Sequence, residues 1–279
     1  MTIDYRRELE TARAIAVEAA ALVSEYRAGQ LIVDSKAGDE PVTNADHAAS
    51  ALIVAKLRAE FPDDVVLSEE IPDDGSRLGR PRVWMVDPID GTRDFILGHD
   101  GFAVMIGLCV DGLPTVGAVS QPVTGKTYTG IVGVGAWLDL RETPTASRQP
   151  LRTSALAGPP GIRLVASKSH RTPRVDAVRK ALMIDDEWNI GSVGLKIGLV
   201  AEAVRDLYVY TGGRTKVWDT CGPEAILHGA GGRMTDLDGR PLRYTDEDLY
   251  NRRGIVASNG PLHDLVIATI APHVTSHAD

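Results

Sequence analysis

The segment "RVWMVDPIDGT" (residues 82–92) constrains the fold and chemistry of this 279-residue chain more than any other. It begins with an apolar run of the kind that forms a buried strand. Asp87 follows this run at once, and Pro88 restrains it to an extended conformation. Asp87 and Asp90 can then face the same point, with the Ile89 carbonyl between them. Groups of oxygen ligands suit hard cations, and this one favours Mg²⁺.

Acidic residues follow apolar stretches at two further places. "DDVVLSEE" (63–70) indicates a short strand that ends in Glu69 and Glu70, and "VWDT" (217–220) contains Asp219. Each acid also has a simpler explanation, because Asp-Pro and Asp-Gly are common in turns and Asp219 could cap a helix. Several acids at strand ends are better explained by one shared pocket, since strand ends fix side chains better than loops do.

Two further features favour a small anionic partner over a polymer. Gly91 allows close backbone approach, and the Gly91 and Thr92 amides would bind an anion if they open a short helix. The net charge of −8 argues against a nucleic-acid polymer, which requires basic surface.

No apolar run approaches membrane-spanning length, so we expect no membrane contact. Cys109 and Cys221 fit neither a disulfide framework nor a zinc site, and we expect a reducing cytoplasm.

Hydrophobic periodicity predicts helices and antiparallel strands first, then alternating strands and helices. This order indicates an α+β half followed by an α/β half, with "ETPTASRQP" (142–150) as the boundary, and hence halves of residues 1–141 and 142–279. The predicted helices are 5–27, 45–60 with Asn44 as its cap, 174–183, 194–204, 221–231 and 261–271. The predicted strands are 63–70, 82–87, two within 102–122 around the turn Asp111-Gly112, 125–138, 162–170, 205–211 and 254–259, with "TDLDG" (235–239) as a turn.

Four ordered motifs resemble those of the inositol monophosphatase superfamily of magnesium-dependent, lithium-sensitive phosphatases. They are "PVTNAD" (41–46), "VLSEE" (66–70), "DPIDGTRDF" (87–95) and "VWDTCGPEAIL" (217–227). The second half is more similar to 3′(2′),5′-bisphosphate nucleotidases than to inositol phosphatases. The resemblance implies a layered αβαβα sandwich, with most metal ligands in the first half, and Asp219 and the substrate contacts in the second.

The resemblance also implies roles for individual residues. The ligands of a first Mg²⁺ would be Glu69, Asp87 and the Ile89 carbonyl, and those of a second Mg²⁺ would be Asp87, Asp90 and Asp219. Asp46 and Thr92 would orient and deprotonate the attacking water, while Glu70 would assist catalysis as an outer-sphere group or as a ligand of a third ion. The implied substrate contacts are Gly91, Thr92, Ser167, His170, Ser192, Lys196 and Asp219. A lysine whose head group reaches the surface is the alternative for Lys196, and a plain loop residue is the alternative for His170.

The function that follows is a Mg²⁺-dependent phosphomonoesterase that removes the 3′-phosphate of adenosine 3′,5′-bisphosphate by two-metal, in-line attack of water. The alternatives are an inositol or other sugar-phosphate phosphatase, and an inactive nucleotide-binding regulator. A haloacid-dehalogenase-type phosphatase would need a DxD pair, whereas this chain has DxxD. Resemblance alone implies a homodimer, lithium sensitivity and a place in sulfur assimilation.

Overall fold

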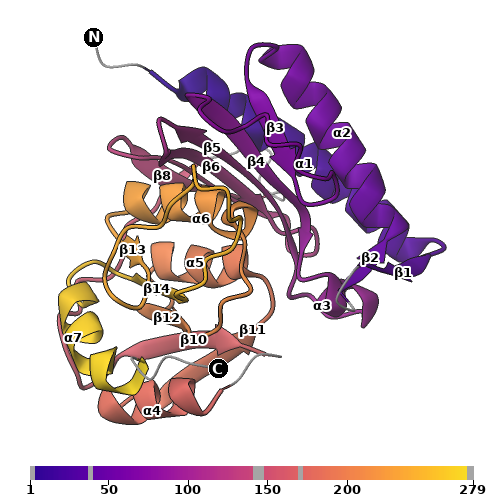
Figure 1. The fold of residues 1–279 in the computed structure, drawn as a ribbon. Coiled ribbons are helices and arrows are strands. Elements are labelled where there is room, and N and C mark those ends of the chain that lie inside the picture. The colour runs from indigo at the N-terminus through magenta and orange to yellow at the C-terminus, as the bar shows by residue number, and fades with distance from the viewer. Residues whose placement is uncertain (1–3, 37–39, 141–147, 169–171, 275–279) are drawn as a thin grey trace.

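The computed structural model describes residues 4–36, 40–140, 148–168 and 172–274, which form five alternating layers of helices and sheets (Figure 1). The predicted layered sandwich is confirmed. The outer helices α1 (Arg6–Ala28) and α2 (Asn44–Glu60) cover one sheet. The helices α5 (Val193–Ala201) and α6 (Val217–Gly229) lie between the two sheets, and α4 (Pro173–Ala181) and α7 (His263–Val274) cover the other.

In the described residues the first sheet has the order β3-β4-β5-β6-β7-β8-β9, and only β3 and β4 are parallel. Its strands are β3 (Val65–Ser68), β4 (Arg82–Asp90), β5 (Ala103–Val110), β6 (Leu113–Ser120), β7 (Lys126–Ile131), β8 (Gly135–Leu140) and β9 (Gln149–Pro150). Because β9 follows residue 141, the last strand of this sheet lies beyond the predicted boundary. The division into two halves stays a prediction.

The second sheet has the order β11-β10-β12-β14-β13, with β10 parallel to both of its neighbours. Its strands are β10 (Arg163–Ser167), β11 (Asp186–Ile190), β12 (Leu207–Tyr210), β13 (Arg233–Thr235) and β14 (Ile255–Ser258). A separate hairpin of β1 (Val33–Ser35) and β2 (Pro41–Thr43) contacts the short helix α3 (Thr92–Ile96). No described helix has the combination of length and apolar character that a membrane span requires.

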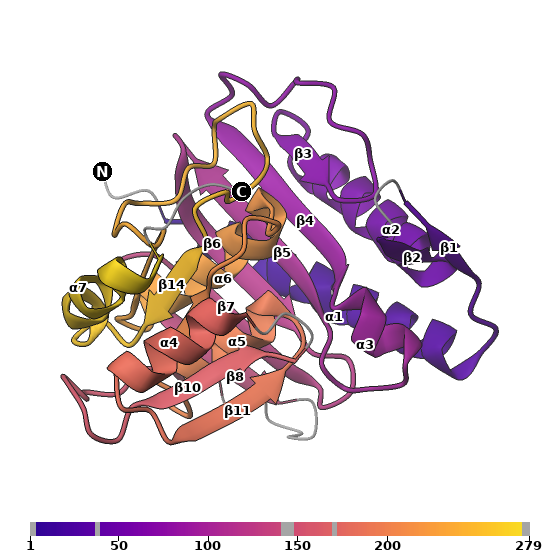
Figure 2. The ribbon, with the colours of Figure 1, turned by 60° about the horizontal axis from the view of Figure 1, so that its bottom comes forward.

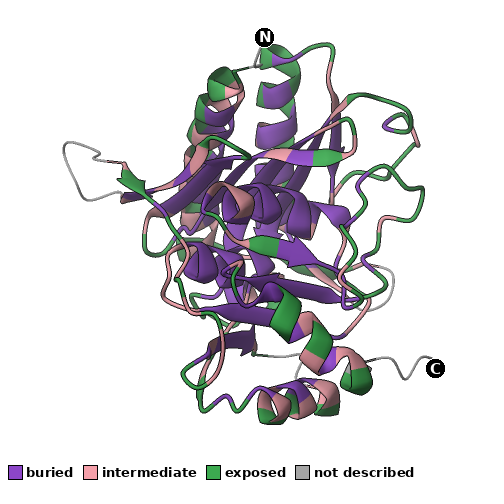
Figure 3. Ribbon diagram, turned by 90° about the vertical axis from the view of Figure 1, so that its left-hand side faces the viewer, coloured by how far each residue is buried: buried purple, intermediate pink, exposed green. Residues whose placement is uncertain are grey.

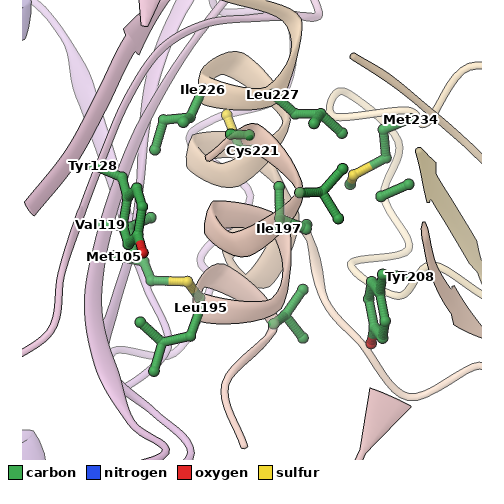
Figure 4. Packing of buried hydrophobic residues seen from close by; sticks show 14 of the residues in the cluster. Met105, Val119, Tyr128, Leu195, Ile197, Tyr208, Cys221, Ile226, Leu227 and Met234 are labelled. Atoms are coloured by element: carbon green, nitrogen blue, oxygen red, sulfur yellow. The ribbon is translucent and has the colours of Figure 1, made fainter. Parts of the chain in front are cut away.

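Apolar side chains fill the space between the layers, and α5 and the central strands of both sheets are buried, whereas the outer helices have exposed faces (Figure 3). In the middle layer, Tyr128 of the first sheet and Tyr208 of the second lie on opposite sides of α5 and α6 (Figure 4). The contact of α6 with the first sheet depends on glycine, because a Cβ atom on Gly117 would lie 2.0 Å from the Gly222 carbonyl oxygen. This packing holds the N-terminal end of α6, and with it Asp219, against the first sheet.

Several details differ from the sequence analysis. Strands β1 and β2 lie in a segment where no strand was predicted, and the predicted strand 125–138 forms the two paired strands β7 and β8. Asn44 does not cap α2, because the Thr43 hydroxyl accepts the Ala45 and Asp46 amides, while the Asn44 side chain bonds the Ile32 amide. Strand β11 has no predicted counterpart, since its exposed edge position removes the apolar alternation that marks a strand. The predicted turns at Asp111-Gly112 and 235–239 are confirmed, and both residues of the former have positive φ, as a two-residue hairpin loop requires.

Candidate active site

A β-bulge at the end of β4 brings Asp87 and Asp90 to the same pocket. Asp87 pairs with Met105 of β5 and Asp90 pairs with Ala103, so three steps along β4 match two along β5. In a regular strand, residues three apart point to opposite faces. The extra residue cancels this reversal, and both carboxylates line one pocket. They lie at the point where β4 leads into α3, and Figure 2 shows the ribbon of these two elements.

Gly91 makes the turn between β4 and α3. Its φ of +98° is favourable only for glycine, and a Cβ atom there would lie 2.6 Å from the Gly101 carbonyl oxygen. The predicted close approach of the backbone at Gly91 is therefore present, and so is the predicted short helix that begins at Thr92.

The pocket has a volume of about 240 Å³ and is lined by segments of both sheets. The sequence-predicted residues that line it are Glu69, Asp87, Ile89, Asp90, Gly91, Thr92, Ser167, Ser192, Lys196 and Asp219. Asp46 and Glu70 do not line the pocket. Asp46 contacts the lining residue Thr92, and Glu70 contacts Lys36. His170 lies outside the described residues. The structure thus gathers residues that are far apart in the sequence, while their individual roles stay predictions.

The acids of the pocket strongly affect one another. Burial raises the pKa of Asp87 well above its usual range, and the charges of Glu69 and Asp90 raise it further. Burial and Asp90 likewise raise the pKa of Asp219 well above its usual range. Burial also raises the pKa of Asp90, although Lys196 opposes this. Carboxylates that resist ionisation together favour the binding of a proton or a cation between them.

Lys36 supplies a positive charge beside this group. Its Nζ atom lies 3.2 Å from Glu69 Oε1 and 2.5 Å from Glu70 Oε1. Burial raises the pKa of Glu70, although Lys36 counteracts it. Both glutamates are thereby turned toward Lys36. Among the described residues, no three His, Cys, Asp or Glu side chains are arranged as a ready-made metal cluster. A cation would have to draw these carboxylates closer together.

Asp46 and Thr92 meet although they are far apart in the sequence. The Thr92 hydroxyl lies 3.3 Å from Asp46 Oδ1 and 3.0 Å from the Ile89 carbonyl oxygen. The other carboxylate oxygen of Asp46 accepts the Thr43 amide at 2.8 Å and the Thr43 hydroxyl at 2.6 Å. These bonds fix Asp46 in the first turn of α2, and burial raises its pKa. One oxygen therefore anchors the side chain, and the other faces Thr92.

Asp219 occupies the corresponding position in α6. Its Oδ2 atom accepts the Lys216 amide at 2.7 Å, in the same capping arrangement that Asp46 has in α2. Asp219 is therefore not the N-cap residue, which is Lys216, but its carboxylate bonds the N-cap amide from within the first turn and also lines the pocket. A cap fixes the orientation of the carboxylate, so one side chain can serve both purposes.

Lys196 is not a surface lysine. It is 3% exposed, and its Nζ atom donates to the Gly191 and Ser192 carbonyls at 3.0 and 2.8 Å. Burial lowers its pKa to about 8, although Asp90 and Asp94 act in the opposite direction. The alternative of a lysine whose head group reaches the surface is therefore wrong, because Lys196 bonds the loop that precedes α5.

Several pocket residues were missed in the sequence analysis. Lys216 bonds Glu40 at 3.1 Å, and this pair joins the β1–β2 hairpin to α6 at the side of the pocket. Arg93 and Arg214 are exposed pocket residues. Arg93 lies within the motif 87–95 and Arg214 shortly before the motif 217–227, but this was a weak signal, since a single basic residue is usually a solvated surface residue.

Comparison with known proteins identifies the class to which this fold and pocket belong. The model of the inositol monophosphatase family matches residues 4–275. The chain belongs to this family and is an enzyme, a phosphatase that resembles bisphosphate nucleotidases.

Individual relatives narrow the resemblance. The chain is 36% identical over 236 residues to a 3′-phosphoadenosine 5′-phosphate phosphatase of Mycobacterium bovis, covering 80% of this chain and 82% of that protein. It is 37% identical over 227 residues to the 3′(2′),5′-bisphosphate nucleotidase CysQ of Escherichia coli K12, covering 81% of this chain and 88% of that protein. The solved structure of CysQ from Bacteroides thetaiotaomicron matches with a TM-score of 0.75 at 29% identity, covering 91% and 98% of the two chains.

Proposed function

We propose that this chain is a Mg²⁺-dependent phosphomonoesterase that converts adenosine 3′,5′-bisphosphate to AMP and phosphate. The observation that carries the proposal is the pocket lined by Glu69, Asp87, Asp90 and Asp219, in which the pKa values of the three aspartates are raised. Such a pocket is unfavourable without a bound cation. The names of the relatives, which are phosphatases of bisphosphonucleotides, support the choice of substrate.

The donor set fits Mg²⁺, because every proposed ligand is an oxygen atom. Glu69, Asp87 and the Ile89 carbonyl would hold one ion, Asp87, Asp90 and Asp219 a second, and Glu70 a third. When bound, Mg²⁺ supplies positive charge that makes water acidic and stabilises the charge of the transferring phosphoryl group.

The residues around Thr92 would handle the proton of the attacking water. In the proposed step, the Thr92 hydroxyl orients the water, and Asp46 receives the proton through its Oδ1 atom. The distance of 3.3 Å between the Thr92 hydroxyl and Asp46 Oδ1 supports this relay. The raised pKa of Asp46, which burial causes, suits a proton acceptor that works near neutral pH.

Other residues of the pocket lining suit the rest of a nucleotide. Tyr208 and Tyr210 provide aromatic surface, and Arg93 and Arg214 provide positive charge. In this proposal they meet the nucleoside and its second phosphate, together with Ser167, Ser192 and Lys196. The predicted homodimer, lithium sensitivity, cytoplasmic location and place in sulfur assimilation rest on the resemblance and stay predictions.

Phosphate release in the presence of Mg²⁺ tests the proposal. We expect a strong preference for adenosine 3′,5′-bisphosphate over inositol 1-phosphate. Asp90→Asn should lower this activity more than about a hundredfold, because even residues that only support a metal ligand contribute 10–100-fold. Asp248→Asn is the control, since Asp248 is an exposed acid paired with Arg252. A preference for inositol 1-phosphate would overturn the substrate, and no Mg²⁺-dependent release from either compound would favour the inactive regulator.

A further inference from the structure

One oxygen of Asp90 is held by the segment that opens α5. The Ser192 hydroxyl donates to Asp90 Oδ2 at 2.6 Å, and the Gly194 amide donates to the same oxygen at 3.0 Å. Both donors belong to the second half of the chain, whereas Asp90 ends a strand of the first sheet. The bonds from Ser192 and Gly194 both end on Oδ2 and not on Oδ1. The two oxygens of this carboxylate are therefore in different surroundings.

Ser192 has an unusual backbone conformation that allows this contact. Its φ is +47°, in the left-handed region that residues other than glycine seldom occupy. The side chain is 4% exposed, and its oxygen also accepts the Leu195 amide at 3.1 Å. One hydroxyl thus caps α5 and bonds Asp90 at the same time. The strained backbone of Ser192 and the two hydrogen bonds of its hydroxyl indicate that the surrounding structure enforces this conformation.

Lys196 also bonds the segment that opens α5. Its Nζ atom donates to the carbonyls of Gly191 and Ser192 and lies 5.3 Å from the centre of the Tyr208 ring. These contacts use the ammonium group to fix the loop in which Ser192 lies. Ser192 thus bonds Asp90, and Lys196 bonds the loop in which Ser192 lies.

We propose that Ser192 is a positioning residue for cation binding, which holds Oδ2 of Asp90 so that Oδ1 is presented to Mg²⁺. The α5 N-terminus assists, because its amides favour a carboxylate. This inference rests on the proposed function, in which Asp90 is a Mg²⁺ ligand. It adds that the second half of the chain sets the orientation of that ligand, and that Ser192 acts through Asp90 even if it also touches the substrate.

Calorimetric titration with Mg²⁺ alone, without substrate, tests the proposal on the wild type, Ser192→Gly and Ser192→Ala. Glycine relieves the positive φ and alanine does not, but both lack the hydroxyl. We expect both variants to bind Mg²⁺ about tenfold more weakly or worse, as is typical when a supporting partner of a ligand is lost. Because no substrate is present in this titration, a loss of Mg²⁺ affinity cannot come from a lost substrate contact.

Ser154→Gly is the matched control. Ser154 donates to Asp206 Oδ1 at 2.5 Å, a bond of the same kind outside the pocket. This variant should keep wild-type Mg²⁺ affinity, and melting curves without Mg²⁺ should confirm that all variants are folded. Unchanged Mg²⁺ affinity in Ser192→Gly, or a raised KM for adenosine 3′,5′-bisphosphate with unchanged Mg²⁺ affinity, would overturn the proposal and leave Ser192 as a structural or substrate contact. A wild type that binds no Mg²⁺ would instead refute the proposed function as well.

Discussion

Asp87 and Asp206 are both buried carboxylates, but their surroundings are opposite. Asp206 is fully buried and accepts two bonds from the Arg163 guanidinium at 2.8 Å, one from the Arg163 amide and one from Ser154. Burial acts to raise its pKa, but these bonds outweigh burial and lower it. Asp87 has one described hydrogen bond, from the Ile89 amide, and faces other acids. Asp206 is satisfied by the protein, whereas Asp87 needs a partner from outside.

The largest expected difference between the two carboxylates is in catalysis. Asp87→Asn should lower Mg²⁺-dependent phosphate release about a thousandfold or more, because it removes a charge shared by both proposed ions. Asp206→Asn should leave kcat within about twofold, since Asp206 does not line the pocket. Steady-state kinetics on both variants measure this contrast. Equal losses of kcat would show that the distinction between the two acids is wrong.

The second difference is in stability. Asp206→Asn should lower the free energy of unfolding by about 3 kcal/mol, because it leaves Arg163 and its neighbours without a charged partner. Asp87→Asn should raise this free energy when Mg²⁺ is removed, since it eliminates a buried and repelled charge. Urea unfolding in EDTA at neutral pH measures both effects. A loss of stability in both variants would mean that Asp87 is a structural acid like Asp206.

Glu224 is an intermediate case, and its expected effect is the smallest. It is buried in α6 and accepts a hydrogen bond from Tyr244, and burial raises its pKa to about 8. The folded protein therefore keeps Glu224 protonated at a pH where the unfolded chain has ionised it. Its contribution to stability is complete below about pH 4.5 and is lost as the pH rises through about 8.

Glu224→Gln removes this pH dependence while it keeps the acceptor for Tyr244. We expect the variant to equal the wild type near pH 4 and to be more stable by about 2 kcal/mol near pH 6, with a larger gain toward pH 8. Unfolding curves across this range measure the difference. A constant difference at every pH would mean that Glu224 does not titrate between the two states.

Much of the fold followed from the sequence, because long periodic segments such as those of α1 and α2 report their buried faces directly. The acids of the site could also be predicted from the sequence, since Asp87 and Asp219 occur in motifs. Strand β11 was not predictable, because it is an exposed edge strand. The bulge that turns Asp90 into the pocket is set by pairing with β5, which the sequence of β4 does not contain.

Contacts between distant segments formed the other limit of the sequence analysis. The bond from Ser192 to Asp90 joins the N-terminus of α5 to the first sheet, and Lys36 reaches Glu70 from the β1–β2 hairpin region. Neither contact leaves a local pattern, because each depends on how separate layers stack. The sequence therefore predicted the acids that line the pocket, while the structure supplies the contacts that hold them in position.

Thermal unfolding of the wild type and Asp87→Asn, with and without Mg²⁺, tests most directly whether the pocket is built for a cation. Without Mg²⁺ we expect Asp87→Asn to melt at a higher temperature than the wild type, because one repelled carboxylate is gone. With Mg²⁺ the wild type should gain several degrees and the variant little, since a bound ligand stabilises only the state that binds it. A wild type that Mg²⁺ does not stabilise, or an equal gain in both proteins, would contradict a cation site at Asp87.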